Sequence, residues 1–244
     1  MRSFLAALQF MTILPVRASF DKRCLERAPV WFPPVGLMLG LAVALADGCG
    51  ARIGLPPNIL NVFSVALLAA LSGGLHLDGL ADTADGFLSA RPRERALEIM
   101  RDSRIGVMGV LALIFVLTLK YVALTGLAGA LRWRALVSAP LAGRAMLLIA
   151  PTLLPYARKD GGLANVFFRR RRPFLAVWAL AWLAGAAVGF LGVAEGLGLV
   201  AVCTFGTLLL GAWSKRRIGG FTGDTLGATS EVVEALALVS VCVL

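Results

Sequence analysis

Acidic residues are scarce in this sequence: Asp and Glu together number 14 among 244 residues, against 24 Lys and Arg. Histidine occurs once, and the four cysteines form no Cys-x-x-Cys pair or other metal-ligand spacing, so the sequence gives no sign of a zinc or iron–sulfur site. Charged residues make up only 16% of the chain and hydrophobic residues 59%. This balance excludes an ordinary soluble domain.

Uncharged stretches are long enough to cross a bilayer. Residues 28–46, 53–77, 173–194 and 196–214 carry no formal charge, and about 20 apolar residues span the hydrocarbon layer as a helix. They lack the alternation of membrane β-strands. We therefore predict an all-α, polytopic transmembrane helix bundle that forms one integral-membrane domain over residues 1–244. Its seven predicted spans are Val30–Ala46, Pro57–Leu77, Ile105–Ala128, Ala135–Pro155, Phe174–Val193, Gly196–Trp213 and Leu226–Leu244.

The basic residues predict how the bundle is oriented. If the first connection is cytoplasmic, 19 of the 24 Lys and Arg lie on the cytoplasmic side, so the N-terminus is predicted inside and the C-terminus outside. The segment Ser3–Leu14 is predicted to be an interfacial or re-entrant helix. The net charge of +10 then needs no nucleic acid as a partner, and the run Arg169–Arg172 is expected to touch anionic lipid of the bilayer. Lys120, inside a span, is expected to snorkel towards the outer surface.

Nine of the 14 acids fall within residues 78–102 and 224–234. Asp78, Asp82 and Asp85 are spaced by four and three residues, so they share one face if the second span continues as a helix. With no basic residue one turn away, three such carboxylates favour a Mg²⁺ site completed by waters and substrate phosphates over a solvated acidic helix end. Asp82, the central residue, is expected to be the most important.

Further site candidates come from two other stretches. Thr222, Gly223 and Asp224 lie in a glycine-rich turn before the last span, where backbone N–H groups can hold an anion. Glu231, seven residues after Asp224, shares its face and needs a partner within the membrane. Arg144 is the obvious one, either as an ion pair or as a phosphate ligand.

Residues 102–104 supply the remaining candidates. Asp102 is a candidate proton acceptor or further ligand, which makes Asp82, Asp85 and Asp102 the predicted catalytic residues. Ser103 and Arg104 are candidates for phosphate contacts. His76 is two residues from Asp78 on a helix, so packing is favoured over catalysis. Glu234 stays unassigned.

These residues together predict a reaction class. A metal held by carboxylates neutralises a pyrophosphate, while a carboxylate accepts the proton of an attacking hydroxyl. Under the predicted topology the clusters lie at cytoplasmic ends of spans. The chemistry indicated is phosphoryl-group transfer with a nucleotide as leaving group.

Several motifs also resemble a known family. GGLHLDGLADTADGF (73–87), EIMRDSRIGVMG (98–109) and GGFTGDTLGATSE (219–231), with FLAALQFMTILPV (4–16) near the N-terminus, are similar to cobalamin synthases, the adenosylcobinamide-GDP ribazoletransferases of bacteria. The resemblance implies a Mg²⁺-dependent enzyme of the bacterial inner membrane whose active site faces the cytoplasm. It would join adenosylcobinamide-GDP to α-ribazole or its 5′-phosphate, release GMP and form adenosylcobalamin or its 5′-phosphate.

Two alternatives stay open at this point. CDP-alcohol phosphotransferases, which make phospholipids and release CMP, have acids in the order D-x2-D-G-x2-A-R, whereas this chain has D-x3-D-x2-D and no following A-R. A cation-coupled transporter would place its carboxylates near the midplane of two related halves, and this sequence has no related halves. The sequence also leaves open the preferred ribazole form, the corrin-binding surface, and whether the chain forms a homo-oligomer or joins other cobalamin-assembly enzymes.

Overall fold

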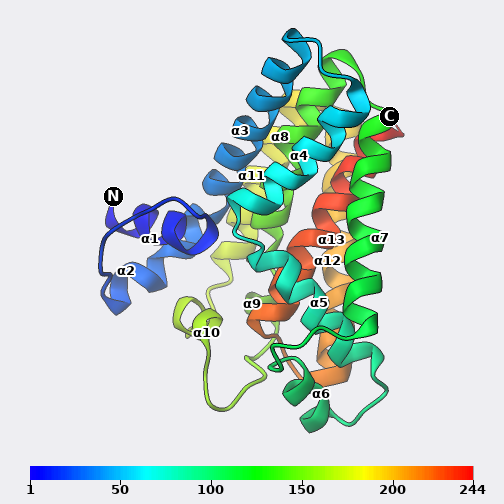
Figure 1. Cartoon of the computed structure of the whole chain (residues 1–244). Coiled ribbons are helices and arrows are strands. Elements are labelled where there is room, and N and C mark those ends of the chain that lie inside the picture. The colour runs from blue at the N-terminus through cyan, green and yellow to red at the C-terminus, as the bar shows by residue number, and fades with distance from the viewer. Residues whose placement is uncertain (244) are drawn as a thin grey trace.

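The computed structural model describes residues 1–243, and these residues fold into a bundle of helices (Figure 1). In chain order the helices are α1 (Arg2–Met11), α2 (Lys22–Arg27), η1 (Ala28–Trp31), α3 (Phe32–Arg52), α4 (Pro57–Leu71), α5 (Leu75–Leu88), α6 (Arg93–Ile99), α7 (Val107–Thr125), α8 (Gly129–Met146), α9 (Ala150–Leu153), α10 (Leu163–Phe167), α11 (Phe174–Leu191), α12 (Val193–Ile218) and α13 (Gly223–Cys242).

Within residues 1–243, six helical segments are long and apolar enough to cross a membrane, and the α4–α5 pair adds a seventh if it is counted as one broken span. The predicted polytopic all-α bundle is therefore confirmed. Most boundaries move by only a few residues, although α8 begins at Gly129 rather than Ala135. Leu244, the final residue of the last predicted span, lies outside the described residues.

The bundle has central and peripheral helices. Every residue of α8 from Ala135 to Met146 is buried, and α8 packs against α3, α11 and α13. The peripheral helices α7, α11 and α12 instead expose large apolar side chains such as Phe115, Val177 and Phe205. A continuous apolar exterior of this kind is what lipid-facing helices present.

Glycines let the central helices approach closely. A Cβ added to Gly36 of α3 would lie 2.5 Å from the carbonyl oxygen of Pro140, and one added to Gly40 would lie 2.6 Å from that of Val137, both in α8. Small residues at such crossings allow backbone-to-backbone packing within a membrane.

The second predicted span, Pro57–Leu77, is not one continuous helix, which corrects the prediction. Helix α4 ends at Leu71, and α5 starts at Leu75 after a bend of 89°. Gly73 and Gly74 between them have φ of 61° and 71°, a left-handed conformation that glycine adopts without strain. The carbonyl of Leu71 accepts a hydrogen bond from the backbone N–H of Ile13 at 2.9 Å. The chain segment after α1 therefore stabilises the break.

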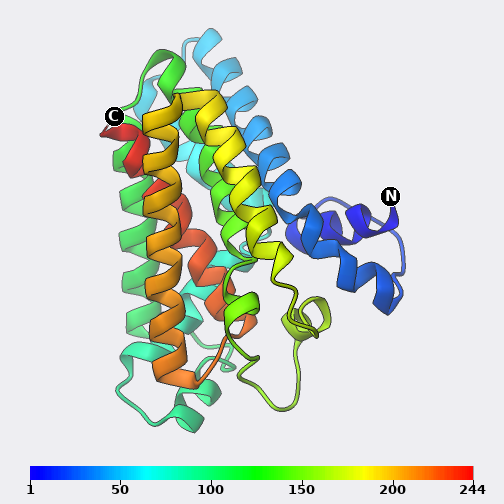
Figure 2. The same cartoon turned by 180° about the vertical axis from the view of Figure 1, so that it is seen from behind.

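The helix termini fall at two ends of the bundle. Helix α7 begins and α12 ends near α6 at one end, whereas the α3–α4 and α7–α8 connections lie at the other end with the C-terminal residues (Figures 1 and 2). Helices α1 and α2 lie beside the bundle rather than within it (Figure 1). Two of the segments predicted to be cytoplasmic, around α6 and at the end of α12, thus lie at one end of the bundle, whereas the N-terminal segment lies beside it. The orientation of the α6 end in a cell stays a prediction.

Candidate functional site

The site begins where α5 crosses α13. A Cβ added to Gly79 would lie 2.8 Å from the carbonyl oxygen of Asp224, and one added to Gly227 would lie 3.2 Å from that of His76. Only glycine permits this approach without displacing backbone. The crossing brings Asp78 and Asp82 of α5 next to Asp224 at the start of α13, although they are more than 140 residues apart in sequence.

The first turn of α13 is held by a reciprocal cap. The hydroxyl of Thr222 accepts a hydrogen bond from the backbone N–H of Thr225 at 3.2 Å, and the hydroxyl of Thr225 accepts one from the N–H of Thr222 at 2.9 Å. Thr222 also donates to Oδ2 of Asp224 at 3.2 Å. A carboxylate in the first turn is favoured by the positive end of the helix dipole. The predicted cluster of Thr222, Gly223 and Asp224 is thus a capped, rigid corner.

Arg158 reaches this corner from a distant segment. The N–H of Phe221 donates to the carbonyl of Pro155 at 2.9 Å, and the N–H of Ala157 donates to the carbonyl of Phe221 at 2.8 Å. This short pairing positions the guanidinium of Arg158 to donate to Oδ2 of Asp224 at 2.6 Å and to the carbonyl of Met100 at 3.3 Å.

The charges at this corner do not cancel. Asp78, Asp82 and Asp224 bring three negative charges and Arg158 one positive charge, which leaves two negative charges when all are ionised. Carboxylates this close repel one another unless a cation lies near them. The charge and the hard oxygen donors suit a divalent cation such as Mg²⁺.

The acidic side chains at this corner do not form a complete metal centre by themselves. Among the described residues, no three His, Cys, Asp or Glu side chains are grouped as a complete metal site. Mg²⁺ generally takes only one or two protein carboxylates and fills its remaining positions with waters and substrate phosphates. The donor set here therefore fits a Mg²⁺ ion that binds together with a phosphate-bearing substrate.

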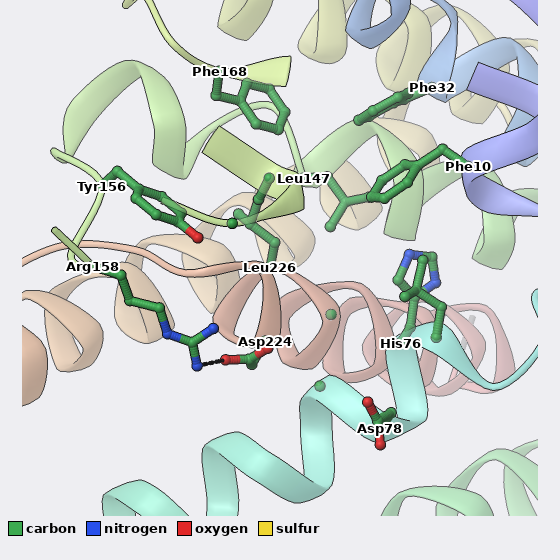
Figure 3. Close-up of a pocket in the computed structure, with 16 residues that line it drawn as sticks. Phe10, Phe32, His76, Asp78, Leu147, Tyr156, Arg158, Phe168, Asp224 and Leu226 are labelled. Carbon is green, nitrogen blue, oxygen red and sulfur yellow. Dashed lines mark hydrogen bonds and ion pairs between the residues drawn. The ribbon is translucent and has the colours of Figure 1, made fainter. Parts of the chain in front are cut away.

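A cavity of about 260 Å³ opens over this corner. Figure 3 shows its two unlike sides: Asp78, Asp224 and Arg158 lie along one, and the rings of Phe10, Phe32, Tyr156 and Phe168 along the other. Leu147, Leu226 and the imidazole of His76 complete the wall between them. The cavity combines a charged floor with an aromatic roof.

Asp85, predicted to share the metal with Asp78 and Asp82, has other contacts in the structure. Its two carboxylate oxygens accept hydrogen bonds from the backbone N–H groups of Gly106 and Gly109, at 2.7 and 2.8 Å. These groups belong to the first turn of α7 and would otherwise lack a helical partner. Asp85 therefore joins α7 to α5, and its role as a metal ligand or catalytic residue stays a prediction.

Residues 102–104 lie in the loop between α6 and α7. Arg104 donates to Asp102 through Nε at 2.9 Å and Nη2 at 2.6 Å, and these bonds lower the pKa of Asp102 to about 2. The side chain of Arg104 is 87% exposed, and Ser103 is exposed as well. The structure brings this loop close to Arg158 through Met100, but none of the three residues is part of the cavity wall within the described chain.

The expectation that Lys120 snorkels is wrong. Its side chain is buried, and its ammonium group donates to Glu231 at 2.6 Å and to Glu234 at 2.5 Å. Arg144, also fully buried, pairs with Glu234 rather than with Glu231 as predicted. Helix α7 packs against α13, which brings the ammonium next to both carboxylates. Their negative charges offset the cost of removing the ammonium from water, so the side chain does not need to extend to the membrane surface. We call these four side chains the buried charge cluster.

The buried charge cluster separates two of the predicted site residues from the others. Glu231 and Arg144 bind within the cluster and do not line the cavity in the described residues. They stay candidates for substrate contact only as predictions. The unassigned Glu234 belongs to the cluster as the partner of both cations.

Some residues of the site carried no clear sequence signal. Arg158 counted only as a basic flank of a span, and Phe10, Tyr156 and Phe168 as apolar residues. The one hint was the position of Arg158 three residues after Pro155, where the predicted fourth span ends. Contact with Asp224 depends on the pairing of two distant loops, which no local pattern encodes.

The chain is similar to known proteins over nearly its whole length. The family model described as cobalamin-5-phosphate synthase matches residues 3–242. An adenosylcobinamide-GDP ribazoletransferase of Geotalea daltonii is 38% identical, covering 98% of this chain and 96% of the relative. Proteins of the same name from Roseiflexus sp. (42% identical, covering 95% and 86%) and Pseudomonas paraeruginosa (41%, covering 98% and 97%) are also similar. No solved structure matches the chain.

Proposed function

Because this chain belongs to the cobalamin-5-phosphate synthase family, we propose that it is the enzyme that joins adenosylcobinamide-GDP to α-ribazole, or to its 5′-phosphate, at the cavity between α5 and α13. A ribose hydroxyl of the acceptor attacks the phosphorus of the phosphate that is esterified to cobinamide, and a new P–O bond forms. The P–O–P bond to the guanosine phosphate breaks, and GMP leaves with the electron pair. The products are adenosylcobalamin or its 5′-phosphate, and GMP.

The observation that carries this proposal is the charged floor of the cavity. Asp78 and Asp224 line the cavity, and the charge of Asp82 lies near both. We assign Asp78 and Asp224, in place of the set Asp78, Asp82 and Asp85, to hold Mg²⁺ with the substrate pyrophosphate. When Mg²⁺ is bound there, its charge neutralises the pyrophosphate and the departing GMP.

The protein's own groups have distinct tasks. Arg158 fixes the orientation of Asp224 through a 2.6 Å hydrogen bond. Gly223 lines the cavity at the start of α13, where the helix dipole favours an anionic group. Asp82, half-buried on α5 between Asp78 and Asp85, is the proposed acceptor of the hydroxyl proton.

We also propose that the cavity faces the cytoplasm across the bacterial inner membrane. The basic segments around α6 and at the end of α12 favour the cytoplasm by the positive-inside rule and lie at one end of the bundle (Figure 1). Arg158, which lines the cavity, contacts the carbonyl of Met100 just after α6. Single-cysteine variants at Ser103 and Ala51, from opposite ends and both exposed, test this with a membrane-impermeant maleimide. In intact spheroplasts only the Ala51→Cys variant should react, and labelling of Ser103→Cys would contradict the orientation.

The test of function uses purified protein in lipid vesicles with adenosylcobinamide-GDP, α-ribazole and Mg²⁺. We expect release of GMP together with the completed corrinoid. Asp82→Asn should abolish both while the protein still inserts, whereas Glu94→Gln, at an exposed glutamate on α6, should behave as wild type. CMP release from a CDP-alcohol, or ion uptake without GMP release, would instead support one of the alternative functions.

A further inference from the structure

The roof of the cavity is built from aromatic rings of separate segments. Phe10 comes from α1, Phe32 from α3, and Phe168 follows α10. Their centroids lie 6.1 Å apart in the Phe10–Phe32 and Phe32–Phe168 pairs. Tyr156 and Phe168 both pack edge-on against Phe221, at 5.4 and 6.1 Å. The rings support one another, and together they give the cavity an apolar, aromatic side.

This side offers few hydrogen-bonding groups. The hydroxyl of Tyr156 already donates to the carbonyl of Gly161, at 3.4 Å. His76 lines the cavity and is buried, and its Nδ1 has no hydrogen-bond partner among the described residues. Because Nδ1 is shielded from solvent, the other ring nitrogen of His76, Nε2, is the one that a ligand in the cavity can reach, and it can donate a hydrogen bond to an acceptor. The matching ligand is flat, mostly apolar and has a single ring nitrogen free to bond.

The reaction offers three bulky groups to this cavity. A corrin macrocycle is far larger than about 260 Å³. Guanine carries donors and acceptors around most of its rim, and these would lose their water here without replacement. The dimethylbenzimidazole of α-ribazole is a fused aromatic ring with two methyl groups and one free ring nitrogen. Its shape and polarity match the aromatic roof.

Resting on the proposed function, we propose that the aromatic roof is the acceptor subsite and binds the benzimidazole base of α-ribazole. Phe10 and Phe168 contact the faces or edges of the base, and Nε2–H of His76 donates a hydrogen bond to its free nitrogen. Because the ribose is attached directly to the base, it then extends towards Asp78 and Asp224 on the opposite side (Figure 3). The attacking hydroxyl thus meets the phosphate at the charged floor.

Steady-state kinetics of Phe10→Leu and Phe168→Leu test this subsite. Leucine keeps an apolar side chain but removes the ring, so the KM for α-ribazole should rise about 3- to 10-fold. The KM for adenosylcobinamide-GDP and kcat at saturating acceptor should change less than about twofold. The matched control is Phe115→Leu on α7, a residue that is 68% exposed on the bundle exterior, and it should match wild type.

A second measurement isolates His76 and works with the unaltered protein. The α-riboside of 5,6-dimethylindole has the same shape as α-ribazole but lacks the free ring nitrogen. We expect its KM to exceed that of α-ribazole by about 3- to 10-fold in the wild type. In His76→Leu the two acceptors should have equal KM values, because the hydrogen bond is absent from both.

The outcomes separate this inference from the proposed function. If the wild type releases no GMP with α-ribazole, the proposed function itself fails. If the wild type is active but the two Phe variants raise the KM for adenosylcobinamide-GDP alone, the roof binds guanine and the inference is overturned. Equal KM values for the two acceptors in the wild type would show that His76 does not bind the ring nitrogen. An unchanged KM for both substrates in the Phe variants would show that the aromatic roof does not bind the base.

Discussion

Replacing Lys120 by methionine gives the sharpest test of how the bundle is held together. Lys120 and Arg144 face Glu231 and Glu234, and each of these side chains is at most 4% exposed. Methionine keeps the length of the lysine stem but removes its charge. Two buried carboxylates then face a single guanidinium.

The size of the effect follows from this imbalance. Removal of one partner from a buried ion pair costs about 3–5 kcal/mol, because the other charge stays buried without compensation. For a chain of 150–250 residues each kcal/mol shifts Tm by about 2–4 °C. We therefore expect Lys120→Met to lower Tm by about 6–20 °C, measured by tryptophan fluorescence of the protein in detergent.

The double variant Lys120→Met/Glu231→Gln restores the charge balance and should recover at least about half of the lost stability. Lys215→Met, at an exposed lysine on α12, is the matched control and should unfold with the wild type. A Tm of Lys120→Met within about 2 °C of wild type would refute the reasoning, and so would a double variant less stable than the single one.

Four further predictions follow from the site. Gly79→Ala should lower the rate of GMP release about tenfold or more, because its Cβ would lie 2.8 Å from the carbonyl of Asp224 and displace α5. The control Gly48→Ala, with no described atom within 4 Å of the new Cβ, should keep the wild-type rate. A wild-type rate in Gly79→Ala would contradict the close crossing of α5 and α13. Asp85→Ala should lower the free energy of unfolding by about 1–3 kcal/mol or more, because two backbone N–H groups at the start of α7 lose their acceptor; an unchanged denaturation midpoint would exclude that role. EDTA should abolish GMP release and added Mg²⁺ should restore it. Full activity after dialysis against EDTA would show that the reaction needs no metal. Asp102→Asn should leave the shape of the pH–rate profile unchanged between about pH 6 and 9, because a carboxyl whose pKa is lowered from 3.8 to about 2 is ionised throughout that range. The contribution of Asp102 to stability is present above pH 3.8 and is lost only as the pH falls towards 2. A changed profile near neutral pH would reinstate Asp102 as a proton acceptor.

Local patterns along the chain were sufficient for much of this description. The charge-free runs determine a bundle of membrane helices, because a helix long enough to cross the hydrocarbon must be apolar along its own length. The spacing of Asp78, Asp82 and Asp85 places them on one helix, and α5 bears this out. The motifs at residues 73–87, 98–109 and 219–231 indicate the family, which the comparison over residues 3–242 confirms.

Contacts between helices were decided only by the tertiary structure. The 89° break after α4 turns α5 across α13, so that Asp78 and Asp82 gain Asp224 and Arg158 as neighbours while Asp85 caps α7. The pairing of Lys120 with Glu231 and Glu234 likewise depends on how α7 is rotated against α13. The physical reason is geometric: one residue turns a helix by about 100°, so a sequence fixes which residues share a face, but the packing of neighbouring helices decides what that face meets.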